Sequence, residues 1–129
     1  MAVSLINISL LKEHEHIDKN NLKKVLGQIK RAKHYKVPII VDKEYYVILD
    51  GHHRMNSCKI LGLTRIPCVL VNYLRDNSIK VVSRKKQIRI NKEIVIEHAL
   101  TTNLFPCKTT KHYIPQRVKG LFIPLNKLS

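Results

Sequence analysis

The spacing of apolar positions changes several times along the first part of the chain. Residues 3–11 (VSLINISLL) are β-branched or aliphatic with polar residues interleaved, which predicts a strand. Over residues 19–33 the apolar positions recur every three or four residues, which predicts a helix with one apolar stripe and a Lys-rich outer face. Asp18 stands directly before this helix as a favourable N-cap.

A hairpin, a second helix and a hydrophobic strand are expected next. Pro38 opens the short apolar run PIIV, and residues 42–44 (DKE) predict a hairpin turn into YYVIL. A helix is expected over residues 53–61, with Gly62 as its C-cap. Pro67 marks the entrance to the next strand, IPCVLVNYL.

The remainder of the chain is less regular. Residues 77–90 predict a basic excursion, to which no helix or strand is assigned, and residues 91–102 predict a helix with Asn91 as N-cap. The loop FPCKTTKH (residues 105–112) and a final strand near residues 121–125 (LFIPL) follow. Strands alternate with helices without repeats or Gly- and Ser-rich linkers, which predicts one compact α/β or α+β unit.

Positive charge dominates the composition. The 129 residues include 24 Lys and Arg against 9 Asp and Glu, a formal net charge of +15. Such a surplus favours an anionic partner, namely nucleic acid, an anionic membrane surface or phosphorylated small molecules. An ordinary basic surface is the alternative, because only residues 83–89 (SRKKQIR) form a compact basic run. Charge alone therefore names no partner.

Two further features bear on location. No run approaches the roughly 20 apolar residues of a membrane span, and neither a basic segment nor a small-residue cleavage site marks the start as a secretion signal. Cys58, Cys68 and Cys107 are odd in number and lack CxxC spacing. We therefore expect a cytoplasmic protein with reduced cysteines and no membrane partner.

The sequence DGHHR lies where a predicted strand passes into a predicted helix. Gly51 permits a sharp turn and a close approach of a ligand to the backbone, and the free N–H groups of the helix start favour an anion. Arg54 can bind two phosphate oxygens at once, and Asp50 could hold Mg²⁺ whose shell phosphate oxygens complete. We favour a functional site over a helix cap beside solvated histidines.

Zinc is a weaker interpretation of the pair His52 and His53. Neighbouring side chains point in different directions, so a metal would need distant partners such as His14 or His16. No HxxxH or CxxC spacing offers the usual pair of ligands.

Two loops carry the remaining candidate chemistry. The acidic loop EHEH (residues 13–16) follows the first strand, and a carboxylate there could take a proton from a nearby hydroxyl nucleophile. The late loop carries Lys108, Lys111 and His112 with two hydroxyls, a small anion-binding set. Taken alone, the acidic loop is better explained as a solvated approach to the Asp18 cap, and the late loop equally well as an exposed basic loop.

Residues 47–71 (VILDGHHRMNSCKILGLTRIPCVLV) resemble the N-terminal domain of ParB, the chromosome-partitioning protein, whose fold is shared with sulfiredoxin and the free L-serine kinases. The shared pattern is a strand, a Gly-x-His-Arg-like phosphate motif, a helix ending in Leu-Gly and a strand opening with Ile-Pro. The resemblance implies an α+β fold with a small mixed sheet and packed helices, in a single domain over residues 1–129.

Within this superfamily the chain resembles the free serine kinases best. They carry Asp-Gly-His-His-Arg, an acidic loop after the first strand and a late Phe-Pro-Pro-Lys-Thr-Thr-Arg-His motif, which here is FPCKTTKH with Cys107 for Pro and Lys111 for Arg. Sulfiredoxin-like proteins have a catalytic cysteine where this chain has His52. After Tyr73 only one helix is predicted, so the DNA-reading half of ParB is not expected.

This resemblance implies phosphoryl transfer from ATP or ADP to the hydroxyl of free L-serine, giving O-phospho-L-serine for cysteine biosynthesis. Glu15 would be the base, with Glu13 as the alternative, and Asp50 would act at the Mg²⁺–phosphate centre. The nucleotide phosphates would be held by Gly51, His52, His53 and Arg54. The serine or the transferred phosphoryl group would be bound by Lys108, Thr109, Thr110 and His112.

Two other functions remain open at this point. A ParB-like nucleotide-dependent DNA-binding or regulatory protein without kinase activity would use the positive charge and the basic run at residues 83–89. A non-catalytic nucleotide-binding module would use DGHHR, while Glu15 would have no chemical role.

Overall fold

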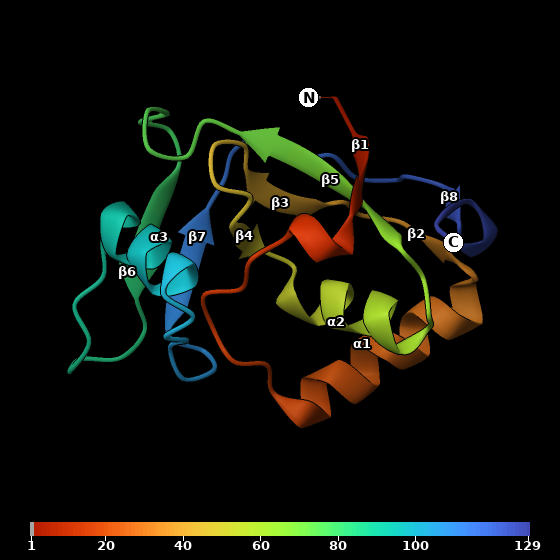
Figure 1. The fold of residues 1–129 in the computed structure, drawn as a ribbon, viewed down its shortest axis with the longest axis horizontal. Helices are drawn as coiled ribbons and strands as arrows, with labels where there is room; N and C mark the ends of the chain where they lie inside the picture. The colour runs from red at the N-terminus through yellow and green to blue at the C-terminus, as the bar shows by residue number, and fades with distance from the viewer. Residues whose placement is uncertain (1) are drawn as a thin grey trace.

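A four-stranded mixed sheet, visible at the centre of Figure 1, organises the chain, which the computed structural model describes over residues 2–129. The strand order is β1-β5-β3-β4, and β3 and β5 are parallel while the two outer pairings are antiparallel. The strands are β1 (Ser4–Asn7), β3 (Ile39–Asp42), β4 (Ile48–Asp50) and β5 (Arg65–Val71).

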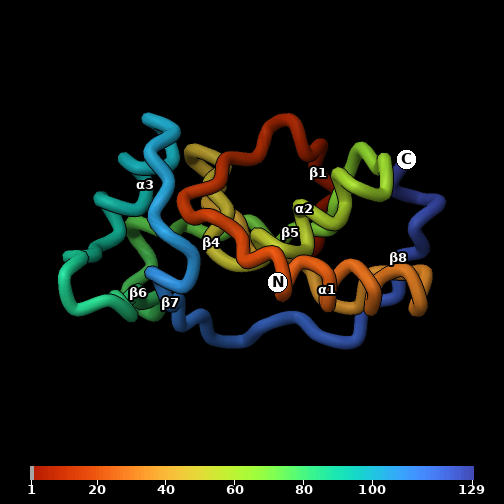
Figure 2. Tube along the Cα trace, turned by 90° about the horizontal axis from the view of Figure 1, so that it is seen from below, coloured from red at the N-terminus to blue at the C-terminus, as the bar shows by residue number. Residues whose placement is uncertain are grey.

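Two small ribbons extend this sheet at opposite ends of the molecule. One pairs β2 (His34–Tyr35) with β8 (Ile123–Pro124), and the other pairs β6 (Lys80–Ser83) with β7 (Thr110–Tyr113), both antiparallel. Figure 2 shows β6 and β7 at one end and β8 at the other. Short 3₁₀ turns occupy Ile8–Leu10 and Leu125–Lys127.

Three helices complete the fold. Helices α1 (Lys19–Ala32) and α2 (His52–Ile60) pack on each other along one side of the sheet, whereas α3 (Lys92–Leu100) lies beside β6 and β7 (Figure 1). None of the helices within residues 2–129 is long and apolar enough to cross a membrane.

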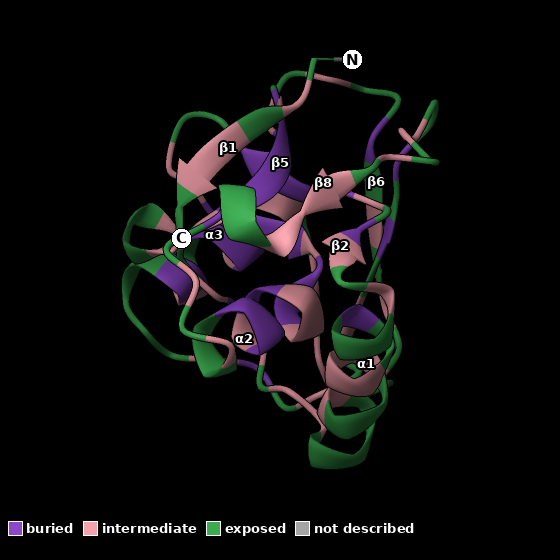
Figure 3. Ribbon diagram, turned by 90° about the vertical axis from the view of Figure 1, so that its right-hand side faces the viewer, coloured by how far each residue is buried: buried purple, intermediate pink, exposed green. Residues whose placement is uncertain are grey.

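The sheet separates two hydrophobic clusters. Successive residues of a strand face opposite sides, so Ile40 joins the cluster with α3 while Ile39 and Val41 join the cluster with α1 and α2. All four residues of β3 are buried, and Figure 3 shows the same for most of β5 and one face of α2. Helix α1 covers this side and exposes its outer face.

Several sequence predictions are confirmed. Helix α1 begins after Asp18, whose side chain accepts a hydrogen bond from Asn20 N–H (3.0 Å). Helix α3 begins after Asn91, which accepts from Ile94 N–H (2.8 Å). The buried strand after Pro38 and the hairpin into β4 are present. The predicted α+β fold with a small mixed sheet and packed helices is confirmed, while the assignment of residues 1–129 to a single domain stays a prediction.

Other predictions are wrong in part. The strand predicted over residues 3–11 ends at Asn7, because the Asn7 side chain accepts from Ser9 N–H (2.9 Å) and starts a 3₁₀ turn. The next strand starts at Arg65, so Pro67 lies inside β5 opposite Leu5. Helix α2 starts one residue earlier than predicted, at His52.

The largest error concerns the late segments. The basic excursion at residues 77–90 contains β6, and the predicted loop at residues 105–112 contains the start of β7. These strands pair Lys80 with Tyr113 and Ser83 with Thr110. Each is four residues long and its partner lies about 30 residues away, so the local sequence carries little signal for the pairing.

Candidate active site

The junction between β4 and α2 is built around Gly51. Its φ of 115° lies in the region that side-chain-bearing residues avoid. An added Cβ would also overlap the Ile39 side chain, lying 2.7 Å from Ile39 Cβ. Both the turn and the packing therefore require glycine, and together they let the chain pass directly from the buried strand into the helix.

The start of α2 offers free backbone donors. The first hydrogen bond of the helix runs from Met55 N–H to the Gly51 carbonyl (3.0 Å). The N–H groups of residues 52–54 precede it and so have no acceptor within the helix. Together with the helix dipole they form a positive end that suits a phosphate group.

The two histidines of DGHHR anchor the acidic loop. His52 Nε2 accepts from His14 N–H (3.2 Å), and His53 Nε2 accepts from Asp18 N–H (3.0 Å). Because a backbone N–H only donates, both Nε2 atoms are unprotonated. Burial, with His14 nearby, lowers the pKa of His52 well below its ordinary value. The ring of His52 is thus neutral and positions the loop, and its backbone N–H rather than its charge is available to an anion.

Asp50 lies at the centre of an ion-pair group. Its Oδ2 pairs with Arg117 and lies 3.5 Å from Arg54 Nη2. Burial alone would raise the pKa of Asp50, but the two guanidinium groups outweigh burial and hold it below its ordinary value. Asp50 is therefore ionised, and it holds two arginines at the turn between β4 and α2.

Glu15 joins the acidic loop to the late loop. One carboxylate oxygen accepts from Thr110 N–H and Thr110 Oγ1–H (both 2.8 Å), and the other accepts from Lys108 N–H (3.1 Å). Glu13 instead contacts α2, through Asn56 (3.2 Å) and Lys59 (3.7 Å). The structure thus separates the two glutamates, because only Glu15 lines the cleft described below.

Two more imidazoles lie near the cleft, with His112 in its lining and His14 behind it. His14 is fully buried, with ring centroids 4.6 Å from His52 and 5.7 Å from His112. His112 Nε2 lies 2.8 Å from Tyr73 Oη. Burial, reinforced by His14, lowers the pKa of His112 to about 3. His112 is therefore neutral at physiological pH and contributes hydrogen bonding rather than charge.

These groups meet in one cleft of about 490 Å³. It joins the acidic loop, one face of α1, the β4–α2 turn, β6 and the late segment. Its cationic side chains are Arg54, Arg84, Lys108, Lys111 and Arg117. Its carboxylates are Glu15 and Asp50. This excess of positive charge suits ligands with several phosphate charges.

Most of the predicted site residues lie in this cleft. Its lining includes Glu15, Asp50, Gly51, His52, His53, Arg54, Lys108, Thr110 and His112. Thr109 is the exception: it is fully buried, and its hydroxyl donates to the Pro106 carbonyl (2.6 Å). Its carbonyl accepts from Arg84 N–H (2.7 Å), so Thr109 shapes the loop and its side chain does not line the cleft.

Sequence reasoning missed part of the lining. Arg117 comes from a segment with no motif, and Arg84 was noted only as part of the basic run at residues 83–89. Helix α1 adds Asn21, Val25 and Gln28, which lie on or beside the predicted apolar stripe of the helix.

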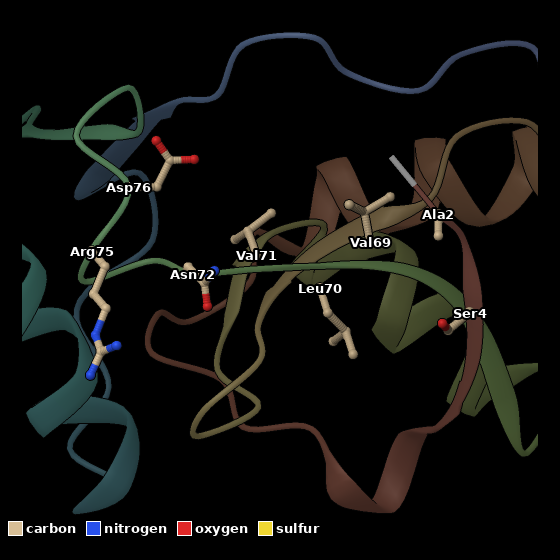
Figure 4. A pocket seen from close by; sticks show the side chains of 8 residues that line it. All are labelled: Ala2, Ser4, Val69, Leu70, Val71, Asn72, Arg75 and Asp76. Atoms are coloured by element: carbon tan, nitrogen blue, oxygen red, sulfur yellow. The ribbon is translucent and has the colours of Figure 1, made fainter.

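A second pocket, along β5 and near the N-terminus, holds less chemistry (Figure 4). Its volume is about 460 Å³, and Arg75 and Asp76 are the charged side chains in its lining. The other labelled side chains are Ala2, Ser4, Val69, Leu70, Val71 and Asn72. Because more charged and polar side chains converge in the cleft around Gly51, we place the candidate active site there.

The side chains of the cleft suit a metal ion that binds together with a nucleotide better than a metal ion held by the protein alone. Within residues 2–129, no group of three or more His, Cys, Asp or Glu side chains is placed to hold a metal ion. Asp50 lies beside the turn between β4 and α2, with one oxygen outside its arginine pairs. Mg²⁺ is commonly bound by one or two carboxylates plus substrate phosphates, so Asp50 fits that requirement.

The chain is similar to two curated kinases over about half of its length. It is 33% identical over 73 residues to an ATP-dependent L-serine kinase of Desulfurococcus mucosus, covering 54% of this chain and 29% of that protein. It is 28% identical over 76 residues to the ADP-dependent L-serine kinase SerK of Thermococcus kodakarensis, covering 56% and 31%. The matched region thus spans less than a third of these relatives.

Comparisons of structure and of family agree on the fold. A free serine kinase in complex with AMP matches with a TM-score of 0.88 at 16% identity, covering 98% of this chain and 93% of that one, which shows a shared fold. Residues 1–85 match the model of the ParB N-terminal domain. The chain therefore belongs to the ParB N-terminal domain family.

Proposed function

We propose that this protein is a free L-serine kinase, which transfers a phosphoryl group from ATP or ADP to the serine hydroxyl and yields O-phospho-L-serine. The observation that carries the proposal is the single cleft in which Glu15, the phosphate-binding turn at Gly51 and the late loop meet. The kinase names of the curated relatives support it. A cytoplasmic location and a role in cysteine biosynthesis remain predictions from the sequence.

The nucleotide phosphates would bind at the start of α2. The N–H groups of residues 52–54 supply directed donors, and Arg54 and Arg117 supply planar guanidinium groups that can bind two oxygens. Both arginines are already held by Asp50. Their fixed positions lower the conformational entropy lost when a phosphate binds.

Asp50 would hold Mg²⁺ bound to the nucleotide. The ion would neutralise charge on the phosphate oxygens during transfer. Asp50 Oδ2 is paired with arginines, so the carboxylate would have to present its other oxygen or exchange an arginine.

Glu15 would take the proton of the serine hydroxyl. Its three hydrogen bonds fix the carboxylate in the cleft. A carboxylate has about four acceptor sites, so one remains for the substrate. Lys108, Thr110 and His112 surround this position and would orient the serine and the transferred group. Phosphoryl transfer depends mainly on such positioning and on charge neutralisation.

The direct test is product formation. Protein, Mg²⁺ and L-serine are mixed with ATP or with ADP, and phosphoserine is followed by phosphorus NMR. We expect product with at least one nucleotide. Absence of product with both, from protein that circular dichroism shows to be folded, would refute the kinase.

The base is tested by a pair of substitutions. Glu15→Gln should lower kcat by about 100- to 10,000-fold, because a general base contributes about that factor, with little change in nucleotide affinity. Glu13→Gln is the matched control, since Glu13 contacts α2 outside the cleft, and it should retain activity. Full activity in Glu15→Gln would remove Glu15 from the mechanism.

A non-catalytic nucleotide-binding protein of the ParB type is the second candidate, favoured by family membership and by the +15 net charge. It predicts that ADP or ATP raises the melting temperature while no phosphoserine forms. Turnover in the assay above decides against it.

A further inference from the structure

Three contacts link Glu15 to a buried histidine. Glu15 Oε1 lies 2.8 Å from Thr110 Oγ1, which lies 3.0 Å from His14 Nε2. His14 Nδ1 in turn lies 2.8 Å from the Ile48 carbonyl oxygen. Glu15 lines the cleft and His14 is fully buried, so this series of contacts leads from the cleft into the core.

When His14 is neutral, the protons available do not satisfy all three contacts. The Ile48 carbonyl only accepts, so His14 Nδ1 must carry a proton there. A neutral imidazole then has no proton on Nε2, and Thr110 has one hydroxyl proton to share between two acceptors, His14 and ionised Glu15. One contact is therefore left without a proton. The other neutral tautomer of His14 carries its proton on Nε2, so its Nδ1 lone pair would face the Ile48 carbonyl oxygen. One of the three contacts would still lack a proton.

We propose that Thr110 and His14 form a proton relay for Glu15, completed by the proton taken from the substrate hydroxyl. This proposal rests on the proposed kinase function. The substrate O–H bond breaks, its oxygen bonds to phosphorus as the bond to the leaving nucleotide oxygen breaks, and the proton goes to the free acceptor site of the Glu15 carboxylate, on Oε2. Passage of this proton to Oε1 through water of the cleft lets Glu15 donate to Thr110 Oγ1, while Thr110 donates to His14 Nε2. All three contacts are then hydrogen bonds, which stabilises protonated Glu15 and makes it a better base.

The groups around His14 keep its ring neutral before the substrate binds. Burial lowers the pKa of His14, while the Glu15 carboxylate and the bond to Ile48 oppose that effect. The other titratable groups that face it are His52, His98 and His112. The ring is therefore neutral before the reaction, and the deficit of one proton exists when the substrate binds. Because Glu15 borders the cleft, water can remove the proton after the product leaves.

His14 and Thr110 act through Glu15, so they are positioning residues, and the relay can be measured without turnover. In protein labelled with ¹⁵N-histidine, the ring signals report which nitrogen of His14 carries the proton. We expect the Nδ1–H tautomer at neutral pH, with an Nε2 signal that follows protonation of Glu15 in the wild type and in Thr110→Ser. In Thr110→Val, which removes the hydroxyl but keeps the shape, this response should disappear. An unchanged response in Thr110→Val, or an Nε2–H tautomer, overturns the relay.

Turnover provides a second readout. Thr110→Val should lower kcat by roughly 10- to 100-fold, part of the factor that general base catalysis supplies, and Thr110→Ser should restore most of it. The dependence of kcat on the fraction of D₂O should be curved in the wild type and linear in Thr110→Val, because the Thr110 hydroxyl proton changes its hydrogen-bond partner as the substrate proton is transferred. Equal kcat and equal curvature in the two proteins would overturn it.

The matched control is Thr101→Val, an exposed position at the end of α3 whose hydroxyl bonds to Glu97 within the helix. It should behave as the wild type in both measurements. If even the wild type makes no phosphoserine, the proposed function fails, whereas the ¹⁵N titration still decides whether the relay exists.

Discussion

Gly51 joins β4 to α2 with a backbone conformation that places two separate demands on the residue. A side chain there would be strained at a φ of 115° and would overlap Ile39 in the middle of the buried strand β3. Gly51→Ala should therefore lower the free energy of unfolding by about 2–5 kcal/mol, combining backbone strain with overpacking. Urea denaturation followed by circular dichroism measures this loss.

Gly62 supplies the control for that prediction. Its φ of 70° is also positive, but nothing lies within 4 Å of the position its Cβ would take. Gly62→Ala should therefore show the strain alone, about 1 kcal/mol. Equal losses at the two positions would mean that Ile39 moves aside and that the close packing under the turn between β4 and α2 contributes little to stability.

The roles of individual site residues differ in how far the sequence could reveal them. Glu15 and Arg54 belong to motifs, so their positions near one another could be inferred. Arg117 pairs with Asp50 across 67 residues of sequence, and no local pattern announces such a contact. His52 and His53 could be predicted in part. Their motif indicated a site, but only the hydrogen bonds that they accept from His14 N–H and Asp18 N–H show that they hold the acidic loop.

At the scale of elements, helix α1 and the acidic loop depend on one residue, Asp18. Its side chain caps α1 through Asn20 N–H, and its own N–H is bound by His53. Asp18→Ala should lower the free energy of unfolding by about 1 kcal/mol through loss of the cap. Asp18→Asn is the matched variant because it keeps a capping oxygen. Its free energy of unfolding should fall by only about a few tenths of a kcal/mol. Thermal or urea unfolding of both proteins provides the comparison, and equal losses would assign the effect to charge instead.

Elements with strong local signals were predictable, whereas the two strands that pair only with each other, β6 and β7, were not. Helices α1 and α3 have a capping residue, and the buried strand β3 has an uninterrupted apolar run. Strands β6 and β7 depend on each other, and each has exposed or half-buried residues at most positions. Their pairing places Arg84 and Thr110 at the cleft, which is why that side of the site was the least predictable.

For the whole molecule, part of the positive charge lies at the cleft. Five cationic side chains line the cleft against two carboxylates, so part of the +15 net charge faces the proposed nucleotide and product. The same side of the molecule contains buried imidazoles at His14, His52 and His112. Because these histidines are buried and neutral beside the cationic side chains of the cleft, their protonation in acid should destabilise the fold.

The sign of that sensitivity follows from the pKa shifts. Burial lowers the pKa of His52 and that of His112, the latter to about 3, below the value of about 6.5 in the unfolded chain. The unfolded state therefore binds more protons in acid, so stability is complete above about pH 6.5 and is lost as the pH falls. Each of the two histidines should contribute up to about 1.4 kcal/mol per pH unit.

Urea denaturation between about pH 7.5 and 5 measures this effect in a window where ordinary carboxylates remain ionised. His112→Asn should reduce the slope of stability against pH, even if it lowers stability throughout, because a titrating group that must stay neutral in the folded protein is gone. His16→Asn, at an exposed position of the acidic loop, should leave the slope unchanged. A stability that stays level from about pH 7 to pH 5 would mean that the buried rings accept protons without unfolding, and therefore that the folded protein does not keep its histidines neutral around the proposed base.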